Sequence, residues 1–303
     1  MTDIAGSIRA ASHGTPSVAA LSWLGPDDAA GRAIAEMLRP FTGASIDYDA
    51  PEAYRVLTVA EAQQELSEFL TVEGTFGENC RLVVPKRMRG LGRIVLKAVN
   101  KIVPACDDAL IFVANRRPDM QRIVIREDHV RVAIGDVRKG WQFPIAMGRF
   151  GGFVAGDGCS AEGASANITD GSVRLGRDCM LSRDIKFYAA DGHGVVDLAG
   201  GRPALKPYVN DTVIGDHVWI GFDVTVLANA RVGSGSIVGA QSCLRGPFGE
   251  NCVIVGNPAK AVRENTTWSR SPTEIDTDAR HYLASAGFPA PVAPGEATLE
   301  PAQ

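Results

Sequence analysis

The chain has 303 residues, of which 45% are hydrophobic and 22% are charged, a composition typical of a folded globular protein with one or two domains. Its formal net charge of −4 gives no electrostatic case for a nucleic-acid partner, and no apolar run approaches the roughly 20 residues that span a bilayer. The N-terminus lacks a secretory signal pattern and the six cysteines form no CxxC pair, so we expect a cytoplasmic protein without disulfides or bound metal.

The first third of the chain is predicted to be a separate unit. Residues 1–105 read as a small α/β domain of unknown role. One helix is predicted over 26–40 from the spacing of its apolar residues. A second helix is predicted over 58–70, where Thr58 and Glu61 have the spacing of a capping box.

A basic stretch follows these helices. Residues 86–103 contain six basic side chains and no acidic one. Within them, 91–102 has a helical period, with Arg93, Lys97 and Lys101 repeating every four residues on one face. A basic amphipathic helix is typical of binding to an anionic membrane surface or partner. We therefore expect weak peripheral membrane contact here; the alternative is a helix packed on the rest of the fold with a solvated basic face.

A six-residue repeat dominates the next part of the chain. Residues 151–256 hold 19 of the 33 glycines, which favours repeated tight corners. Counting every sixth residue finds an aliphatic side chain each time, at Ile214, Ile220, Val226, Val232, Val238 and Leu244. A period of six fits neither an amphipathic helix nor an alternating strand. It fits a prism in which each hexad is one short strand and a corner, and three hexads close one turn every 18 residues.

The repeat is interrupted once. Upstream, Leu175, Leu181 and Phe187 keep the step of six. The 27 positions from Phe187 to Ile214 are not a multiple of six, so residues 190–211 are expected to leave the prism as a loop. Long loops on a regular scaffold usually carry function.

The repeat sets the predicted domain division. Residues 106–265 are expected to form the prism, with irregular lower coils over 106–150 and strands at 110–113 and 123–134. Residues 266–303 are expected to form a C-terminal helix and a disordered Pro/Ala-rich tail.

Residues 150–270 carry the hexads, a loop histidine in DGHG, the triplet WIG and the terminal GNPAK in one order. In this combination they resemble the hexapeptide-repeat acyltransferases, in particular the bacterial O-acetyltransferases that modify capsular or lipopolysaccharide sugars. The resemblance implies a mainly β fold, a left-handed parallel β-helix, and assembly as a homotrimer. It also implies transfer of an acetyl group from acetyl-CoA to a hydroxyl or amine of a saccharide acceptor in surface polysaccharide biosynthesis.

The resemblance assigns roles to individual residues. It makes His193 the general base and leaves Asp191 to orient the imidazole or to cap the turn. It assigns the coenzyme side of the site to Trp219, Phe222, Ala240, Arg245, Lys260 and Arg263. Lys260 and Arg263 are three residues apart on a segment expected to begin a helix, so they would face one way.

Each of these residues has a plainer interpretation. His193 could be a solvated loop residue, Trp219 could pack in a subunit interface, and the three cations could be ordinary surface charges. Arg245 with Gly246 also departs from the Thr-Lys pair that the family often shows. His217, inside a hexad, is expected to face solvent or a subunit interface.

Other functions remain open. The same scaffold serves trimeric zinc carbonic anhydrases, but their histidine pair about five residues apart is absent here, since His193 and His217 are 24 apart. A non-catalytic scaffold or binding protein, and a transferase for a small non-sugar acceptor, are the alternatives to sugar acetylation.

Overall fold

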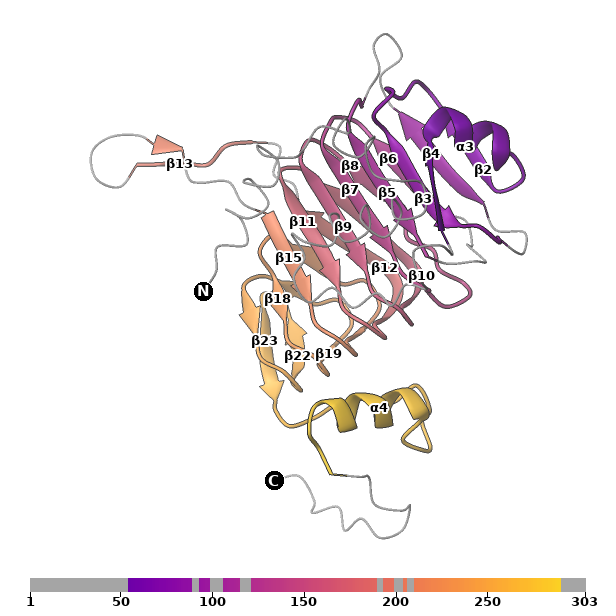
Figure 1. The fold of residues 1–303 in the computed structure, drawn as a ribbon. Coiled ribbons are helices and arrows are strands. Elements are labelled where there is room, and N and C mark those ends of the chain that lie inside the picture. The colour runs from indigo at the N-terminus through magenta and orange to yellow at the C-terminus, as the bar shows by residue number, and fades with distance from the viewer. Residues whose placement is uncertain are drawn as a thin grey trace.

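The computed structural model describes residues 54–88, 93–98, 106–114, 121–189, 193–198, 204–205 and 210–289. In this part of the chain, short strands wind into a three-sided prism (Figure 1). The helix predicted over 26–40 and the predicted orienting residue Asp191 lie outside the described residues, as do residues 290–303.

One side of the prism, here called face 1, is a nine-stranded sheet. β1 is antiparallel to β3, and every later neighbour is parallel. Its strands in spatial order are β1 (Tyr54–Thr58), β3 (Arg81–Pro85), β5 (Ala109–Val113), β7 (Val130–Ile134), β9 (Gly151–Ala155), β11 (Gly171–Leu175), β15 (Asn210–Ile214), β18 (Arg231–Val232) and β21 (Pro247–Phe248).

The other two sides come from one twelve-stranded sheet that bends around a corner. The first half of β12 pairs with β16 at Met180–Trp219, and its second half pairs with β17 at Lys186–Thr225. Face 2 holds the first halves of β10 (Ser160–Ile168) and β12 (Met180–Ala189), with β16 (Trp219–Ile220), β19 (Ile237–Val238), β22 (Val253–Gly256) and β23 (Ala259–Arg263). Face 3 holds their second halves with β2 (Leu70–Glu73), β4 (Ile94–Ala98), β6 (Gln121–Ile125), β8 (Ile145–Met147), β17 (Thr225–Leu227) and β20 (Cys243–Leu244).

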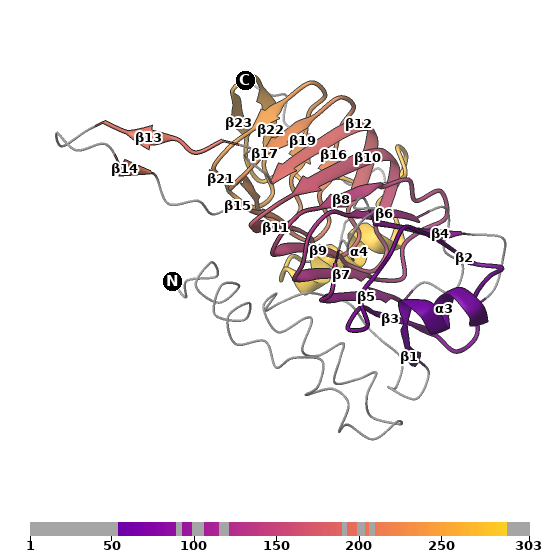
Figure 2. The same cartoon turned by 90° about the horizontal axis from the view of Figure 1, so that it is seen from above.

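Among the described residues, two helices and a hairpin accompany the prism. α3 (Val59–Glu65) buries Val59 and Ala62 at the N-terminal end, and Thr58 and Glu61 form the predicted capping box. α4 (Thr277–Ser285) begins at Asp276 and lies beside the C-terminal coils. The hairpin of β13 (Val196–Asp197) and β14 (Ala204–Leu205) projects away from the prism (Figures 1 and 2).

The hexad prediction is confirmed. All six aliphatic positions from Ile214 to Leu244 are at most 2% exposed. Residues 18 positions apart stack on each other, as when Ile220 pairs with Val238. Phe187 pairs with Val226, which is 39 positions away, because the predicted loop is inserted within that coil.

The helix predicted over 91–102 is wrong in its described part. Ile94–Ala98 is strand β4, with Ile94, Leu96 and Ala98 buried and Lys97 facing outward. Parallel pairing with β2 and β6 satisfies the backbone on both sides, and this tertiary pairing overrides the helical period. The membrane contact expected of residues 86–103 therefore loses the basic helical face on which it depended. Among the described helices, none has the length and apolar character needed to cross a membrane.

The sheets continue across the domain boundary expected after residue 105. β3 pairs with β5 and β4 pairs with β6, so the described part of residues 54–105 extends the prism. Residues 106–150 supply regular strands to the same sheets, and the strand expected over 123–134 turns a corner at 126–129 to become β6 and β7.

We predict that the aromatic cluster inside the prism is a main source of stability. Phe143 is fully buried, and its ring centroid lies 5.1 Å from Phe153 and 5.6 Å from Phe187. Phe143→Ala should lower the free energy of unfolding by about 3–5 kcal/mol, measured by urea denaturation. The same truncation at Phe222, which is 48% exposed, is the control and should cost less than about 1 kcal/mol. Equal losses would contradict the assignment.

Candidate active site

The loop that interrupts the hexads carries the predicted base. β12 ends at Ala189 and β15 begins at Asn210, so the loop leaves the prism where face 3 meets face 1. We call this corner the loop edge. His193 is exposed near the start of the described hairpin, which confirms that its segment leaves the prism.

The loop also exposes apolar side chains. Val195, Val196 and Leu198 are 54%, 49% and 73% exposed. Aliphatic groups gathered on a projecting hairpin favour contact with another surface. The loop therefore presents an apolar surface that is suited to contact with a partner or a ligand.

A second group of predicted residues lies where face 2 meets face 3, here called the wall edge. Trp219 begins β16 on face 2, and Phe222 follows at the corner; the two are 37% and 48% exposed. Gln241 donates its backbone N–H to the Phe222 carbonyl at 2.8 Å, which places the neighbouring Ala240 directly beside Phe222 in the next coil. The structure thus brings Trp219, Phe222 and Ala240 together.

Gly221 makes this close stacking possible. A Cβ at that position would lie 2.9 Å from the Ala240 backbone nitrogen, a contact that any larger residue must relieve by moving the coils apart.

The predicted phosphate-binding cations are all exposed, but they lie in different places. Lys260 and Arg263 lie on β23, so the expected helix is wrong. β23 pairs back on β22, with Lys260 beside Val255 and Arg263 beside Val253, and so covers the open edge of the last coil. Val253 and Val255 lie on the same side of β22, and the register shifts by one residue between Val253 and Ile254, so this bulge places Lys260 and Arg263 on one side of the sheet despite their spacing of three.

Arg245 lies two coils below the loop, on the loop edge, since the next residue, Gly246, accepts a backbone hydrogen bond from Arg231 at the start of β18. His193 and Arg245 are therefore on one edge, while Trp219, Phe222 and Ala240 are on another, with face 3 between them. One chain by itself separates the predicted base from the predicted coenzyme wall.

The third corner, between faces 1 and 2, holds a feature that the sequence did not predict. His217 was expected to face solvent or a subunit interface, but it is only 1% exposed because the chain's own residues 266–285 cover it. We call this segment the C-terminal clasp. The His217 ring lies between Trp268 and Tyr282, with centroids 4.3 Å and 4.6 Å away and nearly parallel planes.

Hydrogen bonds fasten the clasp at the same point. Nδ1 of His217 lies 2.7 Å from Asp178 Oδ2, and Nε2 lies 3.0 Å from the Trp268 carbonyl oxygen. The Trp268 indole donates to the His217 carbonyl at 2.8 Å. The Trp268 ring also lies 6.3 Å from that of Trp219, so the clasp adjoins the candidate wall.

Charge reinforces the clasp. Burial alone raises the pKa of the Asp178 carboxyl, but hydrogen bonds from His217 and Arg270 outweigh it and lower that pKa below its ordinary value. Arg270 Nη2 lies 2.7 Å from Asp178 Oδ1. These partners lie 39 and 92 positions from Asp178 in sequence, so no local pattern could have revealed them.

Comparison with known proteins supports the predicted fold and resemblance. Residues 211–246 match the family model described as "Bacterial transferase hexapeptide (six repeats)". WbbJ of Escherichia coli (strain K12) is 34% identical over 33% of this chain and 56% of its own. Its name provisionally describes a lipopolysaccharide biosynthesis O-acetyl transferase. The polysialic acid O-acetyltransferase of Escherichia coli O1:K1 is 34% identical over 33% of this chain and 32% of its own.

A solved structure shares the fold over most of both chains. The crystal structure of the polysialic-acid-specific acetyltransferase NeuO covers 72% of this chain and 98% of its own, with a TM-score of 0.58 and 21% identity. The predicted mainly β fold, a left-handed parallel β-helix of hexapeptide repeats, is confirmed. The matched segments span about half or less of the two curated relatives, so activity, substrate and partners are inferred below.

We predict that the clasp loosens in acid through Asp276, the N-cap of α4. Burial raises the pKa of this carboxyl, but hydrogen bonds from Ala279, Ser269, Arg270 and Ser271 outweigh it and lower the pKa from 3.8 to about 2. A folded-state pKa below the ordinary value means that this contribution to stability is present above pH 3.8 and is lost as pH falls through about 2.

Asp276→Asn keeps a capping side chain but removes the charge. The gap in melting temperature between wild type and this variant should be widest near pH 6 and should close towards pH 2, measured by circular dichroism. Glu274→Gln is the charge-matched control on an exposed neighbour. A gap that is the same at pH 6 and pH 2 would contradict the role of Asp276.

Proposed function

We propose that this protein transfers an acetyl group from acetyl-CoA to a hydroxyl of a saccharide, in the synthesis of a bacterial surface polysaccharide. The observation that carries the proposal is a hexapeptide prism that exposes a histidine on a projecting loop and aromatic side chains on a neighbouring edge. The names of two relatives, one an O-acetyl transferase provisionally named for lipopolysaccharide biosynthesis and one a polysialic acid O-acetyltransferase, support the reaction and the acceptor class.

The reaction requires one base and no covalent enzyme intermediate. His193 takes the proton of the acceptor hydroxyl while that oxygen attacks the thioester carbonyl carbon. The tetrahedral intermediate then collapses and breaks the carbon–sulfur bond. The departing thiolate takes the proton from His193, so the products are the acetyl ester and free coenzyme A. Asp191 is proposed to orient the His193 imidazole.

The wall edge is proposed to hold the coenzyme. The exposed rings of Trp219 and Phe222 offer apolar surface to the pantetheine arm, and the corner backbone at Phe222 and Ala240 offers it hydrogen-bonding groups. Arg245, Lys260 and Arg263 are proposed to bind the coenzyme phosphates, and these cations can come from either of the two subunits that form a site.

The placement of these residues on two edges supports a homotrimer. In a closed ring of three prisms, the loop edge of one chain can meet the wall edge of the next, which completes each site from two subunits. The same contact would cover the exposed aliphatic groups of the loop and the exposed Trp219. We also place the enzyme in the cytoplasm, since all six cysteines are free.

We predict that His193→Ala lowers turnover by about 100- to 10,000-fold, because the acceptor hydroxyl loses its base. Turnover is measured by thiol release from acetyl-CoA in the presence of a mixture of surface glycans. Calorimetry should show acetyl-CoA binding unchanged in the variant. His281→Ala, a change at an exposed histidine on α4, is the control and should keep full turnover. Near-normal turnover of His193→Ala would disprove the base. Absence of acetyl-CoA binding by wild type would favour a scaffold instead.

We predict that two inactive variants restore each other. In trimers mixed from His193→Ala and Trp219→Ala chains, one interface joins an intact loop to an intact wall, so about a quarter of wild-type turnover should return after subunit exchange. Light scattering should give a trimer mass at micromolar concentration. A monomer mass, or mixed trimers as inactive as their parents, would contradict a site shared between subunits.

A further inference from the structure

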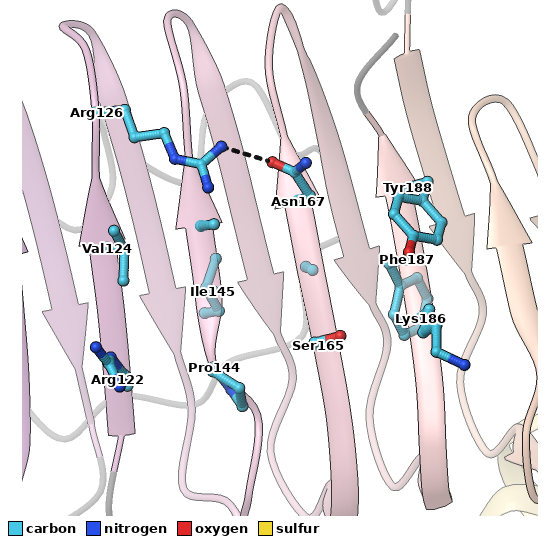
Figure 3. A pocket seen from close by; sticks show the side chains of 12 residues that line it. Arg122, Val124, Arg126, Pro144, Ile145, Ser165, Asn167, Lys186, Phe187 and Tyr188 are labelled. Carbon is cyan, nitrogen blue, oxygen red and sulfur yellow. Dashed lines mark hydrogen bonds between the residues drawn. The ribbon is translucent and has the colours of Figure 1, made fainter. Parts of the chain in front are cut away.

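A shallow groove crosses the outer surface of face 3 (Figure 3). It has a volume of about 400 Å³ and runs across four neighbouring strands, β6, β8, β10 and β12. Three strand spacings of about 4.8 Å make it roughly 14 Å long in the direction of the prism axis. This is the size of site that holds a small molecule or a short piece of a polymer.

The register of the strands places short side chains in the middle of the groove and long side chains at its two sides. Pro144, Ser165 and Asn167 form its floor, together with Ala146, which the register places beside Asn167. Arg122 on β6 and Arg126 directly after β6 lie at one side, and Lys186 and Tyr188 on β12 lie at the other (Figure 3). Val124, Ala146, Asn167 and Tyr188 align on the four strands, so the walls face each other across a flat floor.

The groove is positively charged in a protein that is negative overall. Its twelve lining residues include three cations and no acid, while the whole chain has a net charge of −4. Lys186 pairs with Asp223 at 3.3 Å, and Arg126 donates a long hydrogen bond of 3.5 Å to Asn167. Within the described part of the chain, neither Arg122 nor Arg126 has a carboxylate within 4.0 Å. The Glu73 carboxyl, whose pKa is lowered mainly by Lys97 and in part by Arg122, is an acid that interacts with this charge. Two arginines without an ion pair in the described residues favour an anionic ligand.

The groove also leads to the candidate base. Tyr188 is the penultimate residue of β12, directly before the loop that carries His193, and it is 44% exposed. Its ring offers a flat apolar surface of the kind that packs against a sugar ring, and Asn167 and Ser165 offer hydrogen bonds to hydroxyls. Face 3 lies between the loop edge and the wall edge, so a chain lying in the groove reaches the loop from the side.

We propose that this groove binds an acidic saccharide segment of the acceptor, a sugar unit that bears a carboxylate or a phosphate. The inference rests on the proposed sugar acetyltransferase function and narrows its acceptor to an anionic glycan. Arg122 and Arg126 hold the anionic group, and Tyr188 holds the ring that follows it towards His193. The phosphates of coenzyme A share the same chemistry, so coenzyme binding is measured separately.

The test uses the full-length protein and three charge reversals: Arg122→Glu, Arg126→Glu and, as control, Lys139→Glu. Lys139 is exposed and lies outside the groove. Calorimetry measures binding of oligosialic acid, oligogalacturonate, oligomeric glycerol phosphate, neutral maltohexaose and coenzyme A to each protein, at low and high salt. Circular dichroism and light scattering check fold and assembly of each variant.

We expect at least one acidic probe to bind wild type and maltohexaose not to bind. Each charge reversal in the groove should weaken the binding of the acidic probe by about 10-fold or more, since a charge-assisted hydrogen bond is replaced by repulsion. The affinity of Lys139→Glu for the acidic probe should stay within about twofold of wild type. Coenzyme A binding should be unchanged in all variants, and high salt should weaken the binding of the acidic probe.

Four results would overturn the proposal. The first is that no acidic probe binds wild type at millimolar concentration, and the second is that the groove variants bind the acidic probe as tightly as wild type. The third is that the groove variants lose coenzyme A binding but keep glycan binding. The fourth is that the groove variants dissociate the assembly while Lys139→Glu does not. The last two would assign the groove to the coenzyme or to a subunit interface.

The same measurements separate this inference from the proposed function. If wild type binds acetyl-CoA and its turnover depends on His193 while the groove variants bind acidic probes normally, the groove assignment fails and the acetyltransferase stands. If acidic probes bind through Arg122 and Arg126 while wild type binds no acetyl-CoA, the groove stands and the acetyltransferase fails.

Discussion

Each coil of this prism must place three apolar side chains inside it, directly over those of the coil below. Ile214, Ile220 and Val226 do so in one coil and stack on Val232, Val238 and Leu244 in the next. Backbone hydrogen bonds between the same coils satisfy the peptide groups that this burial removes from water. Because apolar side chains fill most of the interior, the described candidate site residues lie on faces and corners, and the three corners become distinct positions; Gln121, which accepts a hydrogen bond from the Trp141 indole, is a polar side chain held inside.

Those corners have different roles. The loop edge carries His193 and Arg245, the wall edge carries Trp219 and Phe222, and the third corner is covered by the C-terminal clasp. The chain itself covers the third corner, while the exposed aliphatic and aromatic side chains lie on the other two. The three-sided prism thus places the proposed base and the proposed coenzyme wall on different corners of one chain, which is the placement that the proposed trimer uses.

The clasp links stability to the site. Asp178, His217 and Arg270 form a partly buried network whose members satisfy one another, and breaking one partner leaves another without its hydrogen bond. Trp268 packs on His217 and reaches towards Trp219, two residues further along the same coil. The C-terminal clasp, which lies outside the repeat, therefore adjoins the candidate wall.

What the sequence determined by itself is the local and periodic part of this protein. The step of six identified the buried positions, the phase break located the loop with His193, and Thr58 with Glu61 marked the start of α3, because each of these signals is a spacing along the chain. Only the tertiary structure decided what depends on pairing between distant strands. Residues 94–98 carry a helical pattern and become β4 because β2 and β6 take up both of its edges, and Lys260 joins a hairpin because the last coil has an open edge. His217 is buried by the C-terminal clasp, whose Trp268 lies 51 positions away in sequence. Coil-on-coil register gathers Arg122, Arg126, Lys186 and Tyr188 in one groove.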